Sequence, residues 1–267
     1  MQIHRSDHDG GVRLLRLERP PANAINTEFL QSLHDEAVAA DEDDSVRALI
    51  LTGTGRFFSA GLDLKEMARG GAQALGSLGG GKDGIYRLWR VGKPTLAMIG
   101  GHALAGGAIL MFACDFRIAA RGPFKLGVTE TGLGLPLPNG AFQIARYALR
   151  GRDVRRILLE ADAYTPEAAC AMGLVDEVVE PDEFEVRCLA FAGKLGSHPS
   201  AAYGYQKYKL QAEANQWIHA PVEAGTERFR AALADPATFT RLLAARGEGR
   251  PVEASAGGRA AGSTRNG

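Results

Sequence analysis

The chain has 267 residues, enough for one large core or two unequal domains, and its 45% apolar and 23% charged residues are typical of a globular enzyme. Lys and Arg number 31 and balance the 31 Asp and Glu, so no overall field draws the protein to nucleic acid or to an anionic membrane. The apolar runs are shorter than the roughly 20 residues of a membrane span, and the first residues lack an apolar signal region. These features predict no nucleic-acid partner and no membrane partner.

Cysteine usage points to a reducing compartment. Cys114, Cys170 and Cys188 are odd in number and widely spaced, and no CxxC or Cys/His pairing accompanies them. We therefore expect free thiols in a cytoplasmic protein and no metal site.

In the first half of the chain, short apolar runs bounded by Gly, Pro or charge predict strands that are buried on both faces. They lie at 12–17, 48–53, 95–100 and 116–119, and a later run of this kind lies at 174–179. Helical patterns fall between and after them, at 107–114, 139–149 and 153–161. Asn26 is a candidate N-cap for a further helix, and Thr165 followed by Pro166 marks another helix start. Alternating strands and helices indicate an α/β fold with a parallel sheet.

The chain beyond Pro181 is helical in pattern, which divides it into three parts. We expect a core domain over 1–195, a C-terminal helical region that mediates oligomerisation over 196–246, and a disordered tail over 247–267. The glycine-rich segment 69–84 predicts a mobile loop, and its Gly-Gly-Lys-Asp stretch resembles a phosphate-binding loop only superficially.

Two glycine turns carry the chemistry. Residues 57–65 read Phe-Phe-Ser-Ala-Gly-Leu-Asp-Leu-Lys, and residues 101–108 read Gly-His-Ala-Leu-Ala-Gly-Gly-Ala. Each ends a strand on glycine where a helix would begin, which leaves backbone N–H groups unpaired and unobstructed. Two such amides that converge on one carbonyl oxygen would form an oxyanion hole.

The two turns, in this order and about forty residues apart, resemble those of the enoyl-CoA hydratase/isomerase (crotonase) family. The resemblance implies a crotonase-like α/β spiral of ββα units with a C-terminal helical region, assembled as a homotrimer or homohexamer. It also implies an acyl-CoA thioester as substrate, without a further cofactor, whose oxygen is bound by the amides of Leu62 and Gly106. Ala60, Asp63 and Leu64 would contact the adenine of CoA through backbone atoms, and Lys65 and Arg56 are weaker candidates for contacts to its phosphates.

Carboxylates distinguish the activities of this family, whose hydratases carry two glutamates. The first position, three residues after Gly106, is Ile109 here. The second is Glu130, because this register keeps the following Gly-Leu-Gly-Leu-Pro in phase, whereas alignment on Phe124 would place Val128 there. His102 and Asp115 lie nearby in sequence, but we interpret both as structural.

One carboxylate without a second acid favours double-bond isomerisation, because a single base can remove a proton at C2 of a 3-enoyl thioester and return it at C4. The pattern is similar to that of the 3,2-enoyl-CoA isomerases of the family. The alternatives are an enoyl-CoA hydratase, another acyl-CoA lyase or hydrolase, and a non-catalytic or RNA-binding protein with this fold.

Overall fold

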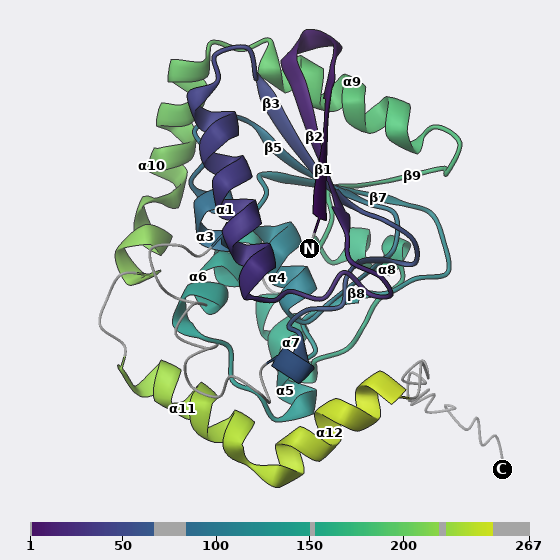
Figure 1. The fold of residues 1–267 in the computed structure, drawn as a ribbon, viewed down its shortest axis with the longest axis vertical. Coiled ribbons are helices and arrows are strands. Elements are labelled where there is room, and N and C mark those ends of the chain that lie inside the picture. Colours follow the sequence, from purple (N-terminus) through teal and green to yellow (C-terminus); the bar gives the residue numbers. More distant parts are fainter. Residues whose placement is uncertain (1, 67–83, 150–152, 219–222, 248–267) are drawn as a thin grey trace, which may run out of the picture.

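The computed structural model describes residues 2–66, 84–149, 153–218 and 223–247 (Figure 1). Its larger sheet has six strands in the order β1-β2-β3-β5-β7-β9. The first pair is antiparallel and every other pair is parallel. The strands are β1 (Gln2–His8), β2 (Val12–Glu18), β3 (Ala48–Gly53), β5 (Thr95–Ile99), β7 (Phe116–Ala120) and β9 (Glu177–Val179).

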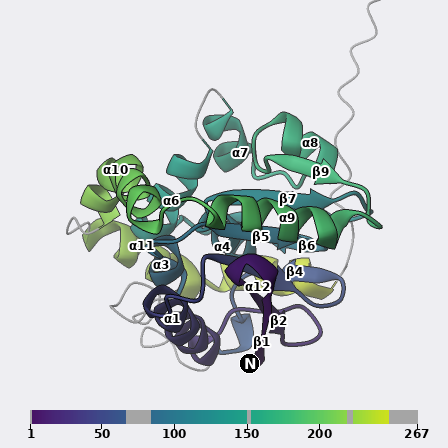
Figure 2. The same cartoon turned by 90° about the horizontal axis from the view of Figure 1, so that it is seen from above.

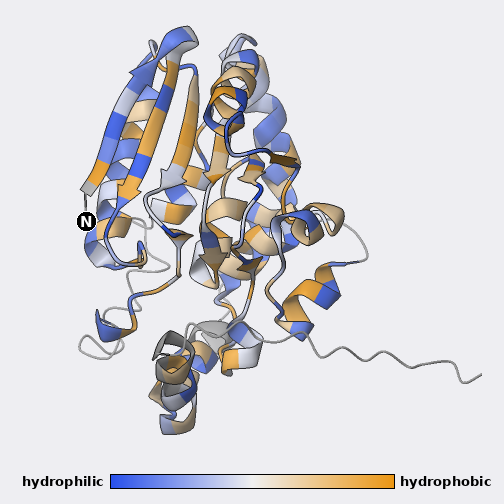
Figure 3. Cartoon of the chain, turned by 90° about the vertical axis from the view of Figure 1, so that its right-hand side faces the viewer, coloured by the Kyte–Doolittle hydropathy of each residue, from blue (hydrophilic) through white to orange (hydrophobic). Residues whose placement is uncertain are grey.

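The inner strands are buried on both faces because alternate side chains enter two different cores. Leu14 and Ile50 pack into a cluster beneath α9 (Phe184–Gly196), whereas the neighbouring Leu15 and Leu51 enter the main core on the other face. In Figure 3 the edge strand near the N-terminus is mostly blue, and the strands beside it carry long orange segments. Each large aliphatic side chain buried in this way stabilises the fold by roughly 1.5–3 kcal/mol.

A second, smaller sheet positions the candidate site. It consists of β4 (Phe57–Ser59), β6 (His102–Leu104) and β8 (Leu126–Gly127), in that order and all parallel. Because the strands are parallel, their carboxyl ends meet at one edge of the sheet, where α/β proteins usually bind ligands. The chain segments that follow these three strands therefore lie side by side.

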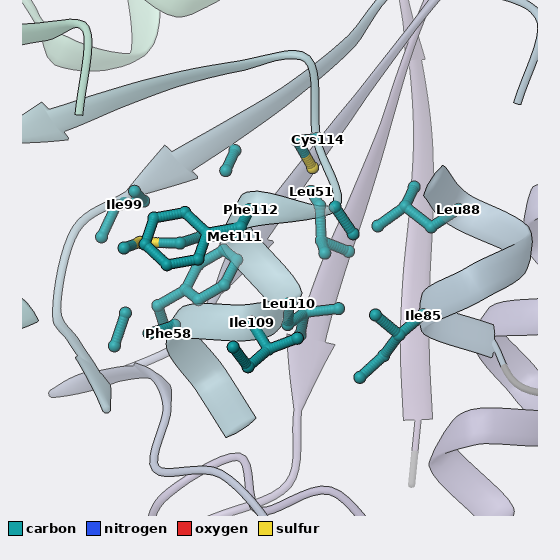
Figure 4. Close-up of a cluster of buried hydrophobic side chains, with 14 of the residues drawn as sticks. Leu51, Phe58, Ile85, Leu88, Ile99, Ile109, Leu110, Met111, Phe112 and Cys114 are labelled. Atoms are coloured by element: carbon teal, nitrogen blue, oxygen red, sulfur yellow. The ribbon is translucent and has the colours of Figure 1, made fainter. Parts of the chain in front are cut away.

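Helices fill the space around the two sheets. The helix α4 (Gly106–Phe112) lies in the main core, and Figure 4 shows its Ile109, Leu110, Met111 and Phe112 among side chains of the strands and of a neighbouring helix. The other helices of the first two thirds are α1 (Thr27–Glu42), α3 (Gly84–Trp89), α5 (Glu130–Leu133), α6 (Asn139–Ala148), α7 (Val154–Glu160) and α8 (Pro166–Ala171).

Both predicted caps are confirmed. Asn26 Oδ1 accepts a hydrogen bond from the Phe29 amide at 2.9 Å, and Thr165 Oγ1 accepts one from the Ala168 amide at 3.3 Å. Each bond satisfies a donor that the first turn of its helix would otherwise leave unpaired.

The C-terminal part is helical, as expected from its pattern. Helix α9 covers the outer face of the larger sheet, and α10 (Ser200–Ile218) lies beside α6, as Figure 2 shows from above. Helices α11 (Glu223–Ala234) and α12 (Pro236–Gly247) form a hairpin at the end of the molecule opposite the β1–β2 turn (Figure 1). The predicted boundary at residue 195 falls at the end of α9, and the division into domains stays a prediction.

The structure corrects the sequence-based elements in a few places. The strand expected at 174–179 spans only Glu177–Val179, because Gly173, with φ +78°, turns the chain and brings it alongside β7 only afterwards. The polar edge strand β1 was not predicted, since it lacks the apolar run of an inner strand. Gly84 does not close the expected loop but opens α3, where a Cβ would lie 2.2 Å from the Leu30 carbonyl oxygen of α1.

The predictions of a mobile glycine-rich loop and of a disordered tail concern residues 67–83 and 248–267, which lie outside the described residues. Among the helices that are described, none has the length and apolar character needed to cross a membrane.

Candidate active site

The three predicted catalytic groups lie just beyond the carboxyl ends of the three strands of the smaller sheet. Leu62 follows β4, Gly106 follows β6, and Glu130 follows β8. The ladder between β6 and β8 continues past β6, since the Ala105 amide donates to the Gly127 carbonyl at 2.9 Å. The fold thus brings together groups that are up to 68 residues apart in the chain.

The two glycine turns lie close together, and a side chain at Gly61 would collide with the second turn. Gly61 has φ +87°, and a Cβ there would lie 2.9 Å from the Gly106 nitrogen and 3.1 Å from the Leu104 carbonyl oxygen. A Cβ at Gly106 would lie 3.5 Å from the Leu62 nitrogen. The amides of Leu62 and Gly106 are therefore near neighbours, and their role as oxyanion donors stays a prediction.

Both amides differ in hydrogen bonding from several neighbouring amides. Within the described part of the chain, neither the Leu62 N–H nor the Gly106 N–H has a hydrogen-bond acceptor. Nearby amides do have acceptors: those of Ala60 and Asp63 donate to the carbonyls of Ala22 and Ile25 at 3.0 and 2.7 Å. An unpaired amide at a turn or in the first turn of a helix can donate to an incoming oxygen.

An unusual backbone conformation directs the second amide. Ala105 has φ +51° and ψ −126°, a region that L-residues rarely adopt and that costs of order 1–3 kcal/mol. Its ψ angle sets the plane of the peptide that carries the Gly106 N–H. The conformation is held because the Ala105 carbonyl accepts hydrogen bonds from the amides of Ala108 and Ile109 at 2.8 and 3.2 Å.

Glu130 is a buried carboxyl group. It is the first residue of the one-turn helix α5, only 6% of it is exposed, and Oε2 has no hydrogen-bond partner among the described residues. Burial raises the pKa of Glu130 to about 7, although backbone hydrogen bonds from its own amide and that of Thr129 act in the opposite direction. A carboxyl group with such a pKa can accept and return a proton near neutral pH.

The other acidic and imidazole candidates are structural, as predicted. Asp115 accepts hydrogen bonds from the Thr95 amide at 3.0 Å and from Lys207, whose Nζ lies 2.9 Å from its Oδ1. His102 Nδ1 accepts a hydrogen bond from the Lys125 amide at 3.1 Å, and its ring packs on Phe57. Each side chain thus has a structural partner.

Ile109, which stands where the hydratases of this family carry their first glutamate, lies in an apolar environment. Ile109 is 3% exposed and packs into the main core from α4 (Figure 4). In the part of the chain that the structure describes, no group of three or more His, Cys, Asp or Glu could hold a metal ion.

The predicted CoA contacts surround the first glycine turn. The Lys65 amide donates to Asp63 Oδ1 at 2.9 Å, and the amides of Ala60 and Asp63 are bonded as described above. Backbone contacts from these residues to adenine would therefore be made by carbonyl oxygens, which suit its amino group. Leu64 is buried, and its role and that of its neighbours in binding stay predictions.

The structure adds partners that the sequence analysis missed. Arg19 forms an ion pair with Asp63 across 44 positions of the chain. The α11–α12 hairpin contributes Phe229 and Leu242 to a small cluster with Leu64 and Leu135. No local pattern connects these segments, so only the tertiary structure could reveal that the hairpin borders the site.

The buried carboxyl group should leave a signature in stability. Because the folded-state pKa of Glu130 lies above the ordinary 4.5, the folded protein binds the extra proton and loses stability as pH rises from about 4.5 to 7. The full shift corresponds to roughly 3 kcal/mol. We expect Glu130→Gln to be more stable than the wild type at pH 8 by up to that amount and nearly equal at pH 4.5, as measured by urea unfolding.

Glu183→Gln is the matched control, since it makes the same substitution at an exposed carboxylate at the start of α9. An equal difference between wild type and Glu130→Gln at both pH values would show that Glu130 titrates normally.

The fold and the site define an α/β protein that presents two unpaired amides and one buried carboxyl group at the carboxyl ends of parallel strands. The model of the enoyl-CoA hydratase/isomerase family matches residues 7–235. A crotonyl-CoA hydratase of Syntrophomonas wolfei is 33% identical over 216 residues, which cover 79% of this chain and 81% of that protein. A 2,3-dehydroadipyl-CoA hydratase of Escherichia coli is 32% identical, with coverage of 75% and 78%.

Solved structures agree on the fold. Human mitochondrial delta3-delta2-enoyl-CoA isomerase superposes with a TM-score of 0.83 at 24% identity, covering 92% of this chain and 97% of that one. An enoyl-CoA isomerase of Mycobacterium tuberculosis gives 0.75 at 28% identity, covering 86% and 97%. The chain therefore belongs to the enoyl-CoA hydratase/isomerase, or crotonase, family and has the predicted crotonase-like fold. It is an acyl-CoA enzyme of that family.

Proposed function

We propose that the protein moves the double bond of 3-enoyl-CoA thioesters from C3–C4 to C2–C3. The observation that carries this proposal is the arrangement at the edge of the smaller sheet. The described residues offer no acceptor to two amides there and no partner to one oxygen of a buried carboxyl group, and an isoleucine stands at the position of a second acid. A proton next to a thioester is weakly acidic, so the base alone would be insufficient without stabilisation of the enolate.

In the proposed reaction, ionised Glu130 removes a proton from C2, and the electron pair moves into a conjugated enolate whose oxygen accepts hydrogen bonds from Leu62 and Gly106. Each such donor is typically worth about 2.7–4 kcal/mol in the transition state. The same carboxyl group, now neutral, returns the proton at C4, and the thioester carbonyl re-forms. Atoms balance without a co-reactant or a further cofactor.

The environment of Glu130 suits both halves of this transfer. A pKa of about 7 leaves much of the carboxyl group ionised near neutral pH and makes its acid form a competent donor. Ile109, at the position of the first carboxylate, cannot hold or deprotonate a water molecule, which favours isomerisation over the addition of water.

Hydration is the second candidate, because the curated relatives quoted above are named hydratases. Hydration requires one group to deprotonate water and usually another group to protonate C2. Ile109 stands at the position that this second group usually occupies, and its side chain cannot carry a proton.

We also infer that the enzyme acts as a homotrimer or homohexamer. Helix α10 exposes large apolar side chains of the kind that subunit contacts bury: Tyr205, Tyr208, Leu210 and Trp217.

Turnover of matched thioesters separates the two chemistries. With NMR assignment of the products, the wild type should convert a 3-enoyl-CoA to the 2-enoyl-CoA and hydrate a 2-enoyl-CoA at least about 10²-fold more slowly, because general acid–base groups contribute roughly that factor. An acyl-CoA should also raise the melting temperature, whereas NAD should not. Efficient hydration of 2-enoyl-CoA would favour a hydratase instead.

A further inference from the structure

The helix that carries Glu130 is too short to hold itself in place. Helix α5 has four residues, and it ends in a glycine cap in which the Gly134 amide donates to the Thr131 carbonyl at 3.1 Å. In the same cap, the Leu135 amide donates to the carbonyl of Glu130 itself at 2.9 Å. The backbone of the candidate base is thus fixed by the C-terminal cap of its own helix.

Arg241 of α12 lies directly on this cap. Its Nε donates to the Leu133 carbonyl at 3.3 Å, at the C-terminus of α5, where a positive charge is favourable. A Cβ at Gly134 would lie 2.5 Å from Arg241 Nη2, so the glycine leaves room for the guanidinium besides permitting φ +81°. A residue from the end of the chain therefore closes the turn that begins with Glu130.

The guanidinium is itself held by its own helix. Arg241 Nη2 donates to Thr238 Oγ1 at 2.8 Å, and Thr238 Oγ1 donates to Asp235 Oδ2 at 2.8 Å. The Thr238 amide also donates to Asp235 Oδ2, at 3.0 Å, which caps the start of α12. These bonds tie Arg241 to the first turn of α12.

Apolar packing joins the hairpin to the same region. Leu135, which follows the cap, is buried with Phe229 of α11 and Leu242 of α12. In Figure 1 the hairpin lies beneath α5 and away from the larger sheet, and Phe229 and Leu242 belong to neither of the two larger core clusters.

We propose that Arg241 is a positioning residue for Glu130: by bonding the Leu133 carbonyl and packing on Gly134, it fixes α5 and with it the carboxylate beside the amides of Leu62 and Gly106. The inference rests on the proposed role of Glu130 as the base. Arg241 acts through the backbone of α5 and does not touch the substrate.

A positioning role and a stabilising role of Arg241 predict effects of different size on turnover and on stability. About half of the Arg241 side chain is exposed, and ion pairs and hydrogen bonds at such sites contribute little to global stability. In contrast, a displacement of about 1 Å in a catalytic group can cost roughly 10²-fold in rate. Loss of Arg241 should therefore affect turnover far more than melting temperature.

The test compares Arg241→Ala and Arg241→Lys with Arg230→Ala, which removes an exposed arginine from α11 of the same hairpin. With a 3-enoyl-CoA substrate we expect Arg241→Ala to lower kcat by roughly 10–100-fold. KM should change by less than about threefold, since CoA contacts lie elsewhere. Arg241→Lys should recover part of kcat by restoring one donor, and Arg230→Ala should match the wild type.

A pH profile provides a readout that a purely structural role would not change. Loosening of α5 should admit water to Glu130 and move the acidic limb of the kcat profile of Arg241→Ala to lower pH. Wild-type kcat and pH profile in Arg241→Ala would overturn the inference, as would an equal loss in Arg230→Ala. If Glu130→Gln retains turnover, the proposed function fails; if only Arg241→Ala behaves as wild type, Glu130 remains the base and the positioning role fails alone.

Discussion

Glu130→Gln is expected to lower the turnover of a 3-enoyl-CoA thioester by at least about 10²-fold, because the amide keeps the shape of the carboxyl group but cannot accept the C2 proton. KM should change little, since the amides of Leu62 and Gly106 remain in place. Steady-state kinetics at pH 8 would measure both constants, under conditions in which the wild-type carboxyl group is mostly ionised.

Glu183→Gln again serves as the control and should leave both constants unchanged. If Glu130→Gln turned over at nearly the wild-type rate, the base would have to be another group. Asp115 would be a poor replacement, because Lys207 and the Thr95 amide already occupy its carboxylate.

Gly61→Ala should lower turnover by about 10²–10³-fold, the loss typical of one missing oxyanion donor. The new methyl group would lie 2.9 Å from the Gly106 nitrogen, so it must push the two turns apart or cover the amides. Kinetics and acyl-CoA binding on the same variant would separate loss of transition-state stabilisation from loss of affinity.

Gly55→Ala is the control variant for backbone strain without a steric clash. Gly55 has φ +69°, close to the +87° of Gly61, but a Cβ there has no neighbour within 4 Å. Gly55→Ala should lose about 1–2 kcal/mol of stability from strain alone and keep its turnover. Gly61→Ala, which adds a clash with the Gly106 nitrogen, should lose at least as much stability and also lose turnover. Equal turnover in the two variants would remove the Leu62–Gly106 pair from the mechanism.

The sequence could predict the parts of the site that depend on local structure. Strand, glycine and helix start follow one another at Gly61 and again at Gly106, so the two turns could be located from their own residues. The inner strands of the larger sheet were predicted because short apolar runs mark strands that are buried on both faces.

The rest of the site depends on contacts between distant segments. The pKa of Glu130 is set by burial, and the pairing of Asp63 with Arg19 and of Leu133 with Arg241 spans 44 and 108 positions. The conformation of Ala105 was also missed, because alanine gives no local indication of a positive φ angle.

The unpaired amides have a consequence for how this enzyme can diverge. A backbone N–H is retained by every residue except proline, so the side chain at position 62 can change without loss of its donor. An alanine scan would pass over Leu62 and find nothing at Ala105, although these positions supply and orient the amides. Mutational tolerance at position 62 therefore carries little information about function, and selection against loss of activity should act instead on Gly61 and Gly107, where a Cβ would meet backbone atoms at 2.9 and 2.1 Å.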